Sequence, residues 1–361
     1  MVRIVLLAAG GTGGHLFPAE SLAQAMADRG WRVHLATDHR IEAYGKKFPA
    51  EKVHFIQSAT LTREPIAAAR AVARLAGGFF EARALIGKLK PSVAVGFGGY
   101  PTVPPMLAAT TMKIPTVLHE ANAVFGRANR FLAGRVTRIA TSFAKVGGSA
   151  GMADRIVQTG NPVRPTVREA AGVPYPVRTS SDPFRLTIFG GSQGAQFLSD
   201  IVPAAVASLA KEMQSRLRIV QQCRAEDVGR VRQAYELLGV EAELAAFFTD
   251  MSQRIADSHL VVSRSGASTC AELAVIGRPA IMIPLPHALD QDQKANAQIL
   301  AAAGGGWMIE QKDLSAQRLA REIARLMDEP ATLATAAAEA KAVGRPDAVD
   351  RLADLVEKVA A

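Results

Sequence analysis

Residues that could bind a nucleotide or a sugar gather in the segment 261–297, VVSRSGASTCAELAVIGRPAIMIPLPHALDQDQKANA. An apolar run ends at Val262, and the polar residues Arg264 and Ser265 follow it directly. Further along, a second polar cluster contains Asp290, Asp292, Gln293 and Asn296. Carboxylates and amides of this kind hydrogen-bond to the hydroxyl groups of riboses and sugars.

Glu272 is the only acid in the apolar run 267–276, which we expect to form a helix that ends at Gly277. A carboxylate can accept hydrogen bonds from both hydroxyls of a ribose. A single acid on a helix more often points into solvent, and this alternative stays open. The glycine turn before the helix and the polar cluster after it favour the binding role.

The order of elements around these residues is strand, glycine turn, helix, strand, polar loop and helix, which is typical of a parallel sheet. The start of the chain repeats this layout. Residues 3–8 and 31–36 are expected strands, and GGTGGH separates the first strand from a helix over 18–29 with Pro18 in its first turn. Loop amides at a helix N-terminus favour a phosphate or a developing oxyanion.

Three further strands are each followed by residues that suit a binding site. Residues 93–96 precede FGGYPT, residues 115–118 precede HEAN and a helix over 125–132, and residues 185–189 precede GGSQGA. The two glycine-rich starts predict two doubly wound domains that face a cleft. His119, Glu120 and Asn122 fit either a binding role or internal hydrogen bonding.

The segment NPVRP at 161–165 is the expected hinge. We therefore predict an N-terminal domain over 1–163 and a C-terminal domain over 164–342. A C-terminal helical segment, 343–361, can return to the first domain.

Composition limits the class of protein. The chain has 361 residues, 49% of them hydrophobic, and a net charge of +9. Cys223 and Cys270 have no metal-type spacing, which suits a reducing compartment and predicts neither a disulfide nor a zinc site. No apolar run reaches the roughly 18 residues of a spanning helix, and the start does not read as a signal peptide. The scattered basic residues suit nucleic acid, an anionic membrane surface or a phosphorylated substrate.

Seven motifs occur in a fixed order along nearly the whole chain: GGTGGHLFPA, GFGGYPT, HEANAVFGRANR, GNPVR, GGSQGA, SRSGASTCAELA and PLPHALDQDQKANA. In this order they resemble the bacterial UDP-N-acetylglucosamine:N-acetylmuramoyl-(pentapeptide) pyrophosphoryl-undecaprenol N-acetylglucosaminyltransferases. That family converts lipid I into lipid II in peptidoglycan synthesis. The resemblance implies the GT-B fold, two Rossmann-like α/β domains around a cleft, with the lipid-linked acceptor on the N-terminal domain and UDP-GlcNAc on the C-terminal domain.

The resemblance also implies roles for individual residues. Glu272 would bind the ribose, Gln293 the GlcNAc hydroxyls, and His15 would lie at the reacting centre. Ser192 and Gln193 would face the diphosphate, and Arg164 and Phe248 the uracil. The full predicted donor set is Thr12, Gly13, Gly14, Asn122, Arg164, Ser192, Gln193, Gly194, Phe248, Ala267, Glu272 and Gln293, and the acceptor set is His15, Tyr100, His119 and Asn129.

Two positions depart from the family pattern. Ala121 stands where glutamine is usual, and Asp292 where histidine or glutamine is frequent. Asp292 brings a negative charge near the sugar, so Gln293 is the stronger candidate for sugar binding.

The implied reaction is a single inverting displacement by the acceptor's 4-hydroxyl. His15 is the candidate base, because neutral imidazole is available near pH 7; the alternative is that His15 only hydrogen-bonds the loop or the substrate. Helix N-termini and Arg164 would stabilise the departing UDP. We expect no metal site and no tightly bound cofactor; a need for a divalent cation is left open.

Two other classes remain as alternatives. A nicotinamide-dependent oxidoreductase would use Asp38, but the third glycine of its fingerprint would fall at Leu16. A non-enzymatic sugar-binding module of the hinge type is disfavoured by the missing secretory signal.

The expected partners are UDP-GlcNAc, undecaprenyl-linked lipid I, an anionic membrane surface and cell-wall synthesis proteins, but no nucleic acid. We expect a peripheral protein on the cytoplasmic face of the membrane. In segment 70–90, Gly77 and Gly78 are expected to loosen the chain, and five basic residues surround the membrane candidates Leu75, Phe79 and Phe80. The alternative is an ordinary helix pair that faces the core and has a solvated basic side.

Overall fold

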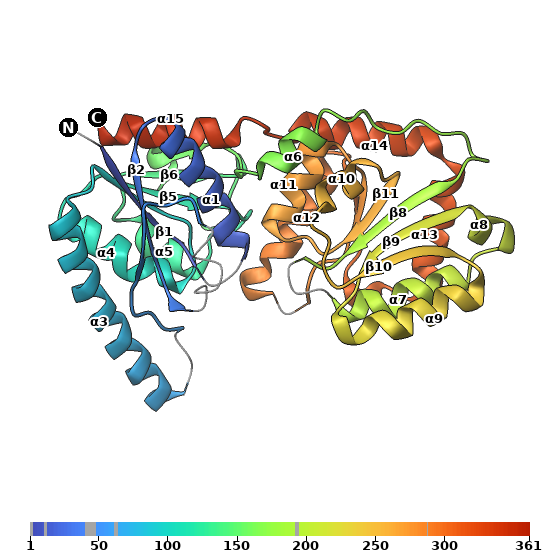
Figure 1. Cartoon of the computed structure of the whole chain (residues 1–361), viewed down its shortest axis with the longest axis horizontal. Coiled ribbons are helices and arrows are strands. Elements are labelled where there is room, and N and C mark those ends of the chain that lie inside the picture. Colours follow the sequence, from blue (N-terminus) through green and yellow to red (C-terminus); the bar gives the residue numbers. More distant parts are fainter. Residues whose placement is uncertain (1–2, 11–12, 40–47, 61–63, 192–194, 287) are drawn as a thin grey trace. The chain divides into compact units, whose positions relative to one another are not determined.

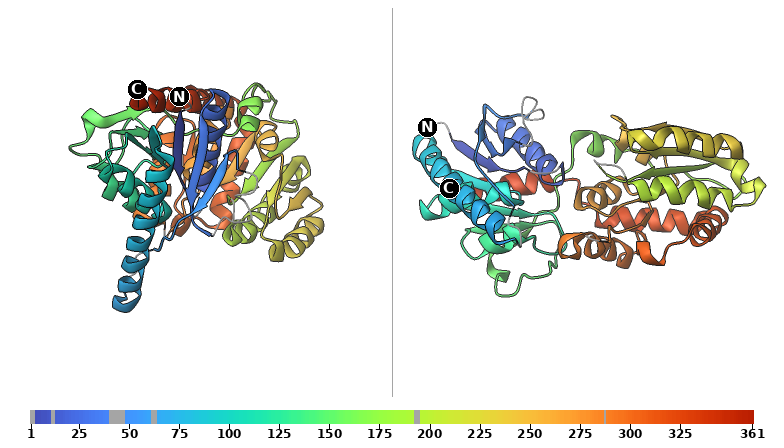
Figure 2. Two further views of the ribbon diagram at one scale, coloured as in Figure 1. Left: turned by 60° about the vertical axis from the view of Figure 1, so that its left-hand side comes forward. Right: turned by 90° about the horizontal axis from the view of Figure 1, so that it is seen from below.

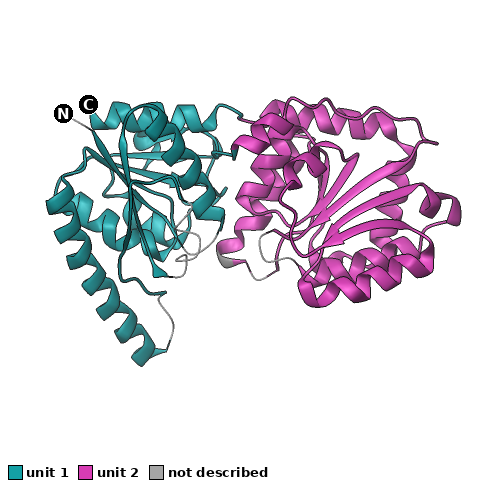
Figure 3. Ribbon diagram, in the orientation of Figure 1, with its two compact units in different colours: residues 1–164, 346–361 teal, residues 165–345 magenta. Residues whose placement is uncertain are grey.

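The computed structural model describes residues 3–10, 13–39, 48–60, 64–191, 195–286 and 288–361 (Figure 1). The chain forms two compact units (Figure 3). Unit 1 contains residues 1–164 and 346–361, and unit 2 contains residues 165–345. The chain therefore passes from unit 1 to unit 2 inside the NPVRP motif, and it returns between Arg345 and Pro346.

Unit 1 is built on a parallel sheet in the order β3-β2-β1-β4-β5-β6-β7. Its strands are β1 (Ile4–Ala8), β2 (Arg32–Thr37), β3 (Lys52–Phe55), β4 (Val93–Gly96), β5 (Thr116–Glu120), β6 (Arg138–Thr141) and β7 (Ile156–Gln158). Apolar runs such as IVLLA in β1 form these strands because a parallel sheet is covered on both faces.

Helices cover the two faces of this sheet. Leu7 packs with α1 (Gly13–Asp28) and α15 (Ala348–Ala360), whereas Leu6 belongs to the cluster formed with α3 (Pro65–Leu89), α4 (Val103–Thr111) and α5 (Arg127–Ala133). This alternation follows from the two-residue period of a strand. Two short 3₁₀ segments complete the unit, η2 (Tyr100–Thr102) and η3 (Ala153–Arg155).

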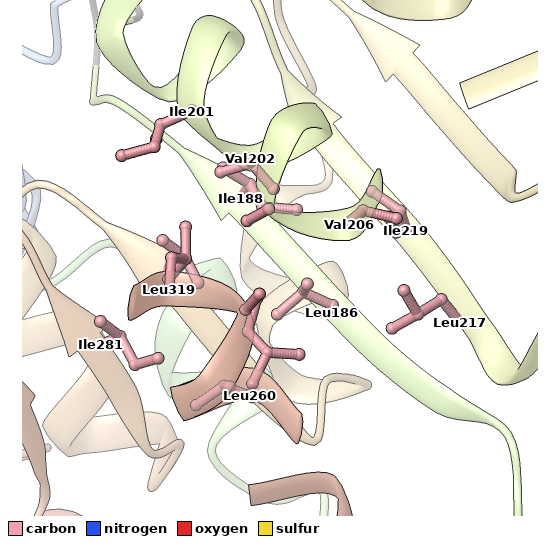
Figure 4. Close-up of a cluster of buried hydrophobic side chains, with 14 of the residues drawn as sticks. Leu186, Ile188, Ile201, Val202, Val206, Leu217, Ile219, Leu260, Ile281 and Leu319 are labelled. Carbon is pink, nitrogen blue, oxygen red and sulfur yellow. The ribbon is translucent and has the colours of Figure 1, made fainter. Parts of the chain in front are cut away.

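Unit 2 repeats the design with a parallel sheet in the order β10-β9-β8-β11-β12-β13. Its strands are β8 (Phe184–Phe189), β9 (Leu217–Gln222), β10 (Glu241–Ala245), β11 (Leu260–Ser263), β12 (Ala280–Met282) and β13 (Gly306–Met308). Its helices are α6 (Pro165–Ala170), α7 (Gln196–Ala207), α8 (Lys211–Arg216), α9 (Val228–Leu238), α10 (Met251–Ala256), α11 (Ala267–Ile276), α12 (Asp292–Ala302), α13 (Ala316–Asp328) and α14 (Pro330–Val343), with 3₁₀ segments η4 (Ala225–Asp227), η5 (Leu289–Gln291) and η6 (Gln311–Asp313). Figure 4 shows its core, where Val202 and Val206 of α7 lie over Ile188 and Ile219 of the sheet.

The doubly wound α/β fold predicted from the glycine-rich loops is confirmed in both units. In each sheet the strand order reverses beside the first strand, between β1 and β4 in unit 1 and between β8 and β11 in unit 2. Ligands of such sheets bind beyond the carboxyl ends of the strands at that reversal. The candidate residues are therefore sought at these two places.

Three local predictions were wrong. Helix α1 begins at Gly13, so Pro18 lies inside it, where the missing N–H removes one helical hydrogen bond. Strand β5 extends two residues beyond the predicted end at 118, so His119 and Glu120 are its last residues. Segment 65–89 is one continuous helix of 25 residues, so Gly77 and Gly78 neither loosen it nor divide it into a pair.

The last helix, α15, belongs to unit 1 although it is the end of the chain. Arg29 at the end of α1 forms ion pairs with Asp354 at 2.7 Å and Glu357 at 2.9 Å. Trp31 donates its indole N–H to Glu357 at 3.0 Å. Among the described residues, no helix has the length and apolarity that a membrane crossing requires.

Candidate functional site

His15 lies in the first turn of α1, against the glycine loop that follows β4. Gly98 and Gly99 have positive φ angles of 92° and 75°. A Cβ atom at Gly98 would lie 3.3 Å from both His15 Cε1 and Asn129 Nδ2, so a side chain at this position would crowd both groups. Glycine therefore allows the loop backbone to approach the imidazole closely.

The environment of His15 keeps its imidazole neutral. Burial lowers its pKa, and the backbone carbonyl of Phe97 opposes this shift only in part. Nδ1 of His15 is buried without a partner at hydrogen-bonding geometry. A neutral imidazole is the form that a general base needs near pH 7.

The loop after β4 is held by Thr102, which sequence reasoning had not singled out. Its hydroxyl donates to the carbonyl of Gly98 at 2.6 Å or of Ala8 at 3.1 Å. The N–H of Phe97 also bonds to Ala8, at 2.9 Å. Tyr100, predicted to bind the acceptor, lies half-buried in this loop.

Glu120 organises the loop after β5. Its carboxylate is 2% exposed and accepts the backbone N–H groups of Asn122 and Gly126, both at 3.0 Å, and the side-chain amide of Asn129 at 2.8 Å. Burial raises the pKa of Glu120, and these hydrogen bonds oppose the shift. Glu120 thus fixes two predicted site residues, Asn122 and Asn129.

Asn129 retains a free acceptor, whereas His119 is enclosed. The oxygen Oδ1 of Asn129 is buried and has no partner. His119 is 0% exposed, donates from Nε2 to the carbonyl of Gly160 at 3.2 Å and packs on Phe97. Burial lowers its pKa to about 4. These contacts of His119 lie within unit 1, and its predicted role in acceptor binding stays a prediction.

Arg264 follows β11 and holds the chain beyond β12. Its guanidinium donates to the carbonyls of Ile283 at 3.1 Å and Pro284 at 3.2 Å and to the side chain of Gln311 at 2.7 Å. Burial lowers its pKa. The contact fixes the path of the loop that leads to Gln293.

Glu272 and Ala267 lie on α11, directly beyond the carboxyl end of β11. Glu272 is 8% exposed, which rules out the alternative of a freely solvated acid. Ser268 lies one helical turn before Glu272, and its hydroxyl is buried without a partner. Sequence reasoning missed Ser268; its spacing of four residues from Glu272 was the available signal.

Gln293 is held at the start of α12. Its Oε1 accepts the N–H of Leu285 at 3.1 Å, which leaves the side-chain NH₂ to donate. Its carbonyl accepts the hydroxyl of Ser265 at 2.9 Å, and Asn296 donates to the carbonyl of Ser265 at 3.2 Å. The pKa of Asp292 is raised by burial and by the charge of Asp290.

The two residues predicted for the uracil belong to different units. Arg164 lies in unit 1, with its guanidinium 5.0 Å from the ring of Phe17. Phe248 lies in unit 2, is 8% exposed and has the guanidinium of Arg254 at 4.2 Å from its ring. Each is described only within its own unit.

Some predicted donor residues lie outside the described residues, namely Thr12, Ser192, Gln193 and Gly194. Gly13 and Gly14 form the start of α1 in unit 1, and Gly191, before the undescribed part of its loop, has a φ of 84°. Across the described ranges, no group of three or more His, Cys, Asp or Glu side chains is arranged to hold a metal ion.

Comparisons with known proteins identify the family. Residues 5–141 match the glycosyltransferase family 28 N-terminal domain, and residues 185–352 match the glycosyltransferase family 28 C-terminal domain. The chain belongs to glycosyltransferase family 28. The predicted glycosyltransferase class and the GT-B fold are thereby confirmed.

Relatives within family 28 match nearly the whole chain. A protein of Mesorhizobium japonicum is 57% identical over 99% of this chain and 95% of its own length. A protein of Rhizobium meliloti is 54% identical over 99% of this chain and 96% of its own length. Both are named UDP-N-acetylglucosamine–N-acetylmuramyl-(pentapeptide) pyrophosphoryl-undecaprenol N-acetylglucosamine transferase. The family resemblance drawn from the seven motifs is therefore confirmed.

Solved structures agree with this assignment. Acinetobacter baumannii MurG has a TM-score of 0.81 and 28% identity, with 99% of each chain covered. The glycotransferase of kitacinnamycin has a TM-score of 0.73 at 17% identity over 100% of both chains, a likeness that shows the fold alone.

Proposed function

We infer that this chain moves GlcNAc from UDP-GlcNAc to the MurNAc of an undecaprenyl-pyrophosphoryl-MurNAc-pentapeptide, turning lipid I into lipid II in peptidoglycan synthesis. The observation that carries this conclusion is the near full-length identity of 57% to a relative named for that transfer. The nicotinamide alternative loses its support, because family 28 domains occupy both halves of the chain.

The residue roles remain proposals that the geometry supports. We assign Glu272 to the ribose hydroxyls, because a buried carboxylate beyond the carboxyl end of β11 can accept both of them. Gln293 uses its NH₂ as a donor to a GlcNAc hydroxyl. The loop after β8, including 192–194, and Arg164 stabilise the departing UDP.

The chemical step follows from these assignments. The 4-hydroxyl oxygen of MurNAc attacks the anomeric carbon of GlcNAc, and the bond from that carbon to UDP breaks with inversion. The proton of the hydroxyl passes to His15, and UDP leaves with the bonding electrons. We propose that Asn129 Oδ1, buried and without a partner, accepts a hydrogen bond from the acceptor.

One assay tests the proposed function. UDP release from UDP-GlcNAc is measured with a lipid I analogue, beside a nicotinamide absorbance control. Acceptor-dependent UDP release is the expected result, and release that does not depend on the acceptor contradicts the function. The same assay with and without a chelator tests whether transfer needs a divalent cation, the point that the sequence leaves open.

We propose that the enzyme docks peripherally on the cytoplasmic face of the membrane through α3, and that Phe80 is its main apolar contact. Phe80 is 67% exposed, and Ile66 and Val72 of the same helix are 64% and 57% exposed. Phe79 instead packs on the core of unit 1, and Leu75 is half-buried, so both are weaker candidates. Arg70, Arg74 and Arg83 are exposed on α3 and suit anionic headgroups.

The adjacent phenylalanines form a matched pair of variants. Phe80→Ser lowers co-sedimentation with anionic vesicles and leaves the unfolding midpoint nearly unchanged. Phe79→Ser lowers the unfolding midpoint, because it removes packing from the core. If Phe80→Ser sediments like the wild type, α3 is not the membrane contact.

A further inference from the structure

Helix α3 is tied to the segment that follows β3 by contacts that concentrate on Gln57. The carboxylate of Glu81 accepts the backbone N–H of Gln57 at 2.9 Å and its side-chain amide at 2.8 Å. A Cβ atom at Gly78 would lie 1.9 Å from the carbonyl oxygen of Gln57, so only glycine allows this approach. The first turns of α3 extend beyond the rest of unit 1 (Figures 1 and 2).

The same segment is bound to the end of β2. The N–H of Ile56 donates to the carbonyl of Thr37 at 2.7 Å, and Ile56 is 5% exposed. The hydroxyl of Ser58 donates to the carboxylate of Asp38 at 3.3 Å. Residues 56–58 therefore connect α3 on one side with Thr37 and Asp38 on the other.

Thr37 in turn contacts the loop that leads to His15. A Cβ atom at Gly10 would lie 2.8 Å from the hydroxyl oxygen of Thr37 and 3.2 Å from Pro101 Cβ. Gly10 also lies against Gly99, where a Cβ atom would be 3.3 Å from its carbonyl oxygen. A shift of residues 56–58 would therefore pass through Thr37 to Gly10 and Gly99, and a Cβ atom at Gly99 would lie 3.3 Å from His15 Cδ2.

We propose that Glu81 and Gln57 couple the docking of α3 on the bilayer to the arrangement of the catalytic loops, and that Glu81 is a positioning residue for transfer at the membrane. The inference rests on the proposed function. The hydrogen bonds between Glu81 and Gln57 are exposed, and the buried contacts at Gly78 and Ile56 beside them transmit a displacement because closely packed groups have few voids to absorb it. An acid such as Glu81 on a helix that meets an anionic surface is electrostatically unfavourable. Its hydrogen bonds to Gln57 indicate that it has a structural role on this helix.

The test compares turnover of one acceptor in anionic vesicles with turnover of a short-chain, water-soluble acceptor. Vesicles stimulate the wild type, and Glu81→Ala reduces that stimulation about fivefold or more. Co-sedimentation with the anionic vesicles stays at the wild-type level or rises, because an acid has been removed, and turnover of the soluble acceptor stays at the wild-type level. Gly78→Ala gives the same pattern, because its methyl group displaces α3 from Gln57.

Glu64→Ala is the matched control, since Glu64 is the acid before the first turn of α3 and is exposed. It removes the same charge from the docking surface without touching Gln57, and it keeps full stimulation. Equal stimulation in Glu81→Ala and Glu64→Ala overturns the coupling. An equal loss of turnover by Glu81→Ala on both acceptors also overturns the coupling, because it indicates a merely structural role for Glu81. A wild type that transfers to neither acceptor contradicts the proposed function instead.

Discussion

The two units share the order of their first six strands, to which unit 1 adds β7, but they differ in how their polar groups are used at the carboxyl ends of the strands. In unit 1, titratable or amide atoms are buried without partners, namely His15 Nδ1, His119 Nδ1, Asn129 Oδ1 and both amide atoms of Asn161. In unit 2, Arg264, Ser265, Gln293 and Asn296 bond to the backbone or to one another. The unpartnered atoms there include Nε of Arg264 and the hydroxyls of Ser263 and Ser268.

This difference separates two tasks. A pre-arranged loop network binds a substrate at little ordering cost, which suits the donor nucleotide in unit 2. Buried polar groups without partners are costly, and we propose that His15 Nδ1 and Asn129 Oδ1 gain hydrogen bonds when the acceptor binds, which suits the reacting centre in unit 1. Changes in unit 1 should therefore lower turnover, and changes in unit 2 should weaken donor binding.

The largest effect is expected for His15→Ala. Loss of a general base typically lowers turnover about 100- to 10,000-fold, and the binding of UDP should stay nearly intact. The measurements are kcat with saturating substrates and the Kd for UDP. His39→Ala is the control, because His39 is exposed and stacks on Phe55. Turnover within threefold of the wild type would show that His15 is not the base.

The pH dependence sharpens the same assignment. His15 must be neutral to accept a proton, and burial lowers its pKa from 6.5. The kcat/KM should therefore rise with pH and reach its plateau at a midpoint below 6.5, so that activity is full at pH 7 and is lost on acidification. A midpoint above 7 in the profile of kcat/KM argues against His15.

Much of the fold of the two units could be predicted from the sequence. Glycine-rich turns after apolar runs predicted the doubly wound sheets, because few other folds need that pattern. Thr102 escaped notice because a lone hydroxyl carries no distinctive spacing, whereas Ser268 lies four residues before Glu272, a spacing that places both on one helix face. The sequence left open whether His119 and Phe79 are enclosed or accessible, since a strand or helix pattern does not show which neighbours surround a side chain.

Glu272→Ala tests the assignment of donor binding to unit 2. Loss of a charge-assisted hydrogen bond should weaken UDP binding by roughly 1.5–3 kcal/mol, with little change in affinity for the acceptor. Titration with UDP gives the first quantity, and KM for the acceptor gives the second. Glu236→Ala removes an exposed acid from α9 of the same unit and should bind UDP normally. An unchanged Kd for UDP in Glu272→Ala removes the ribose assignment.

A smaller, specific effect is expected at Gln293. Gln293→Ala should narrow the preference for UDP-GlcNAc over UDP-GalNAc, because a site that bonds a hydroxyl rejects an analogue that misplaces it. Gln293→Glu keeps the Oε1 contact to the N–H of Leu285 but loses the NH₂ donor. It should therefore narrow the preference between the two donors in the same way, without disturbing the loop at Leu285. The ratio of kcat/KM for UDP-GlcNAc to kcat/KM for UDP-GalNAc measures this preference. If both variants keep the wild-type ratio, Gln293 does not read the sugar.

The smallest effect is expected for α15, the last helix of the chain, which packs on unit 1. Arg29→Ala removes ion pairs to Asp354 and Glu357, whose side chains are 70% and 34% exposed, so solvent screening limits their value. We expect a loss of about 0–1 kcal/mol of unfolding free energy. Hydrogen exchange should quicken in α1 and α15 but stay unchanged in unit 2, because these contacts lie within unit 1 alone. Arg351→Ala is the matched control, since Arg351 pairs with Asp347 inside the C-terminal segment. If Arg29→Ala quickens hydrogen exchange equally in both units, the contacts of α15 also stabilise unit 2. The expectation that their effect is confined to unit 1 is then wrong.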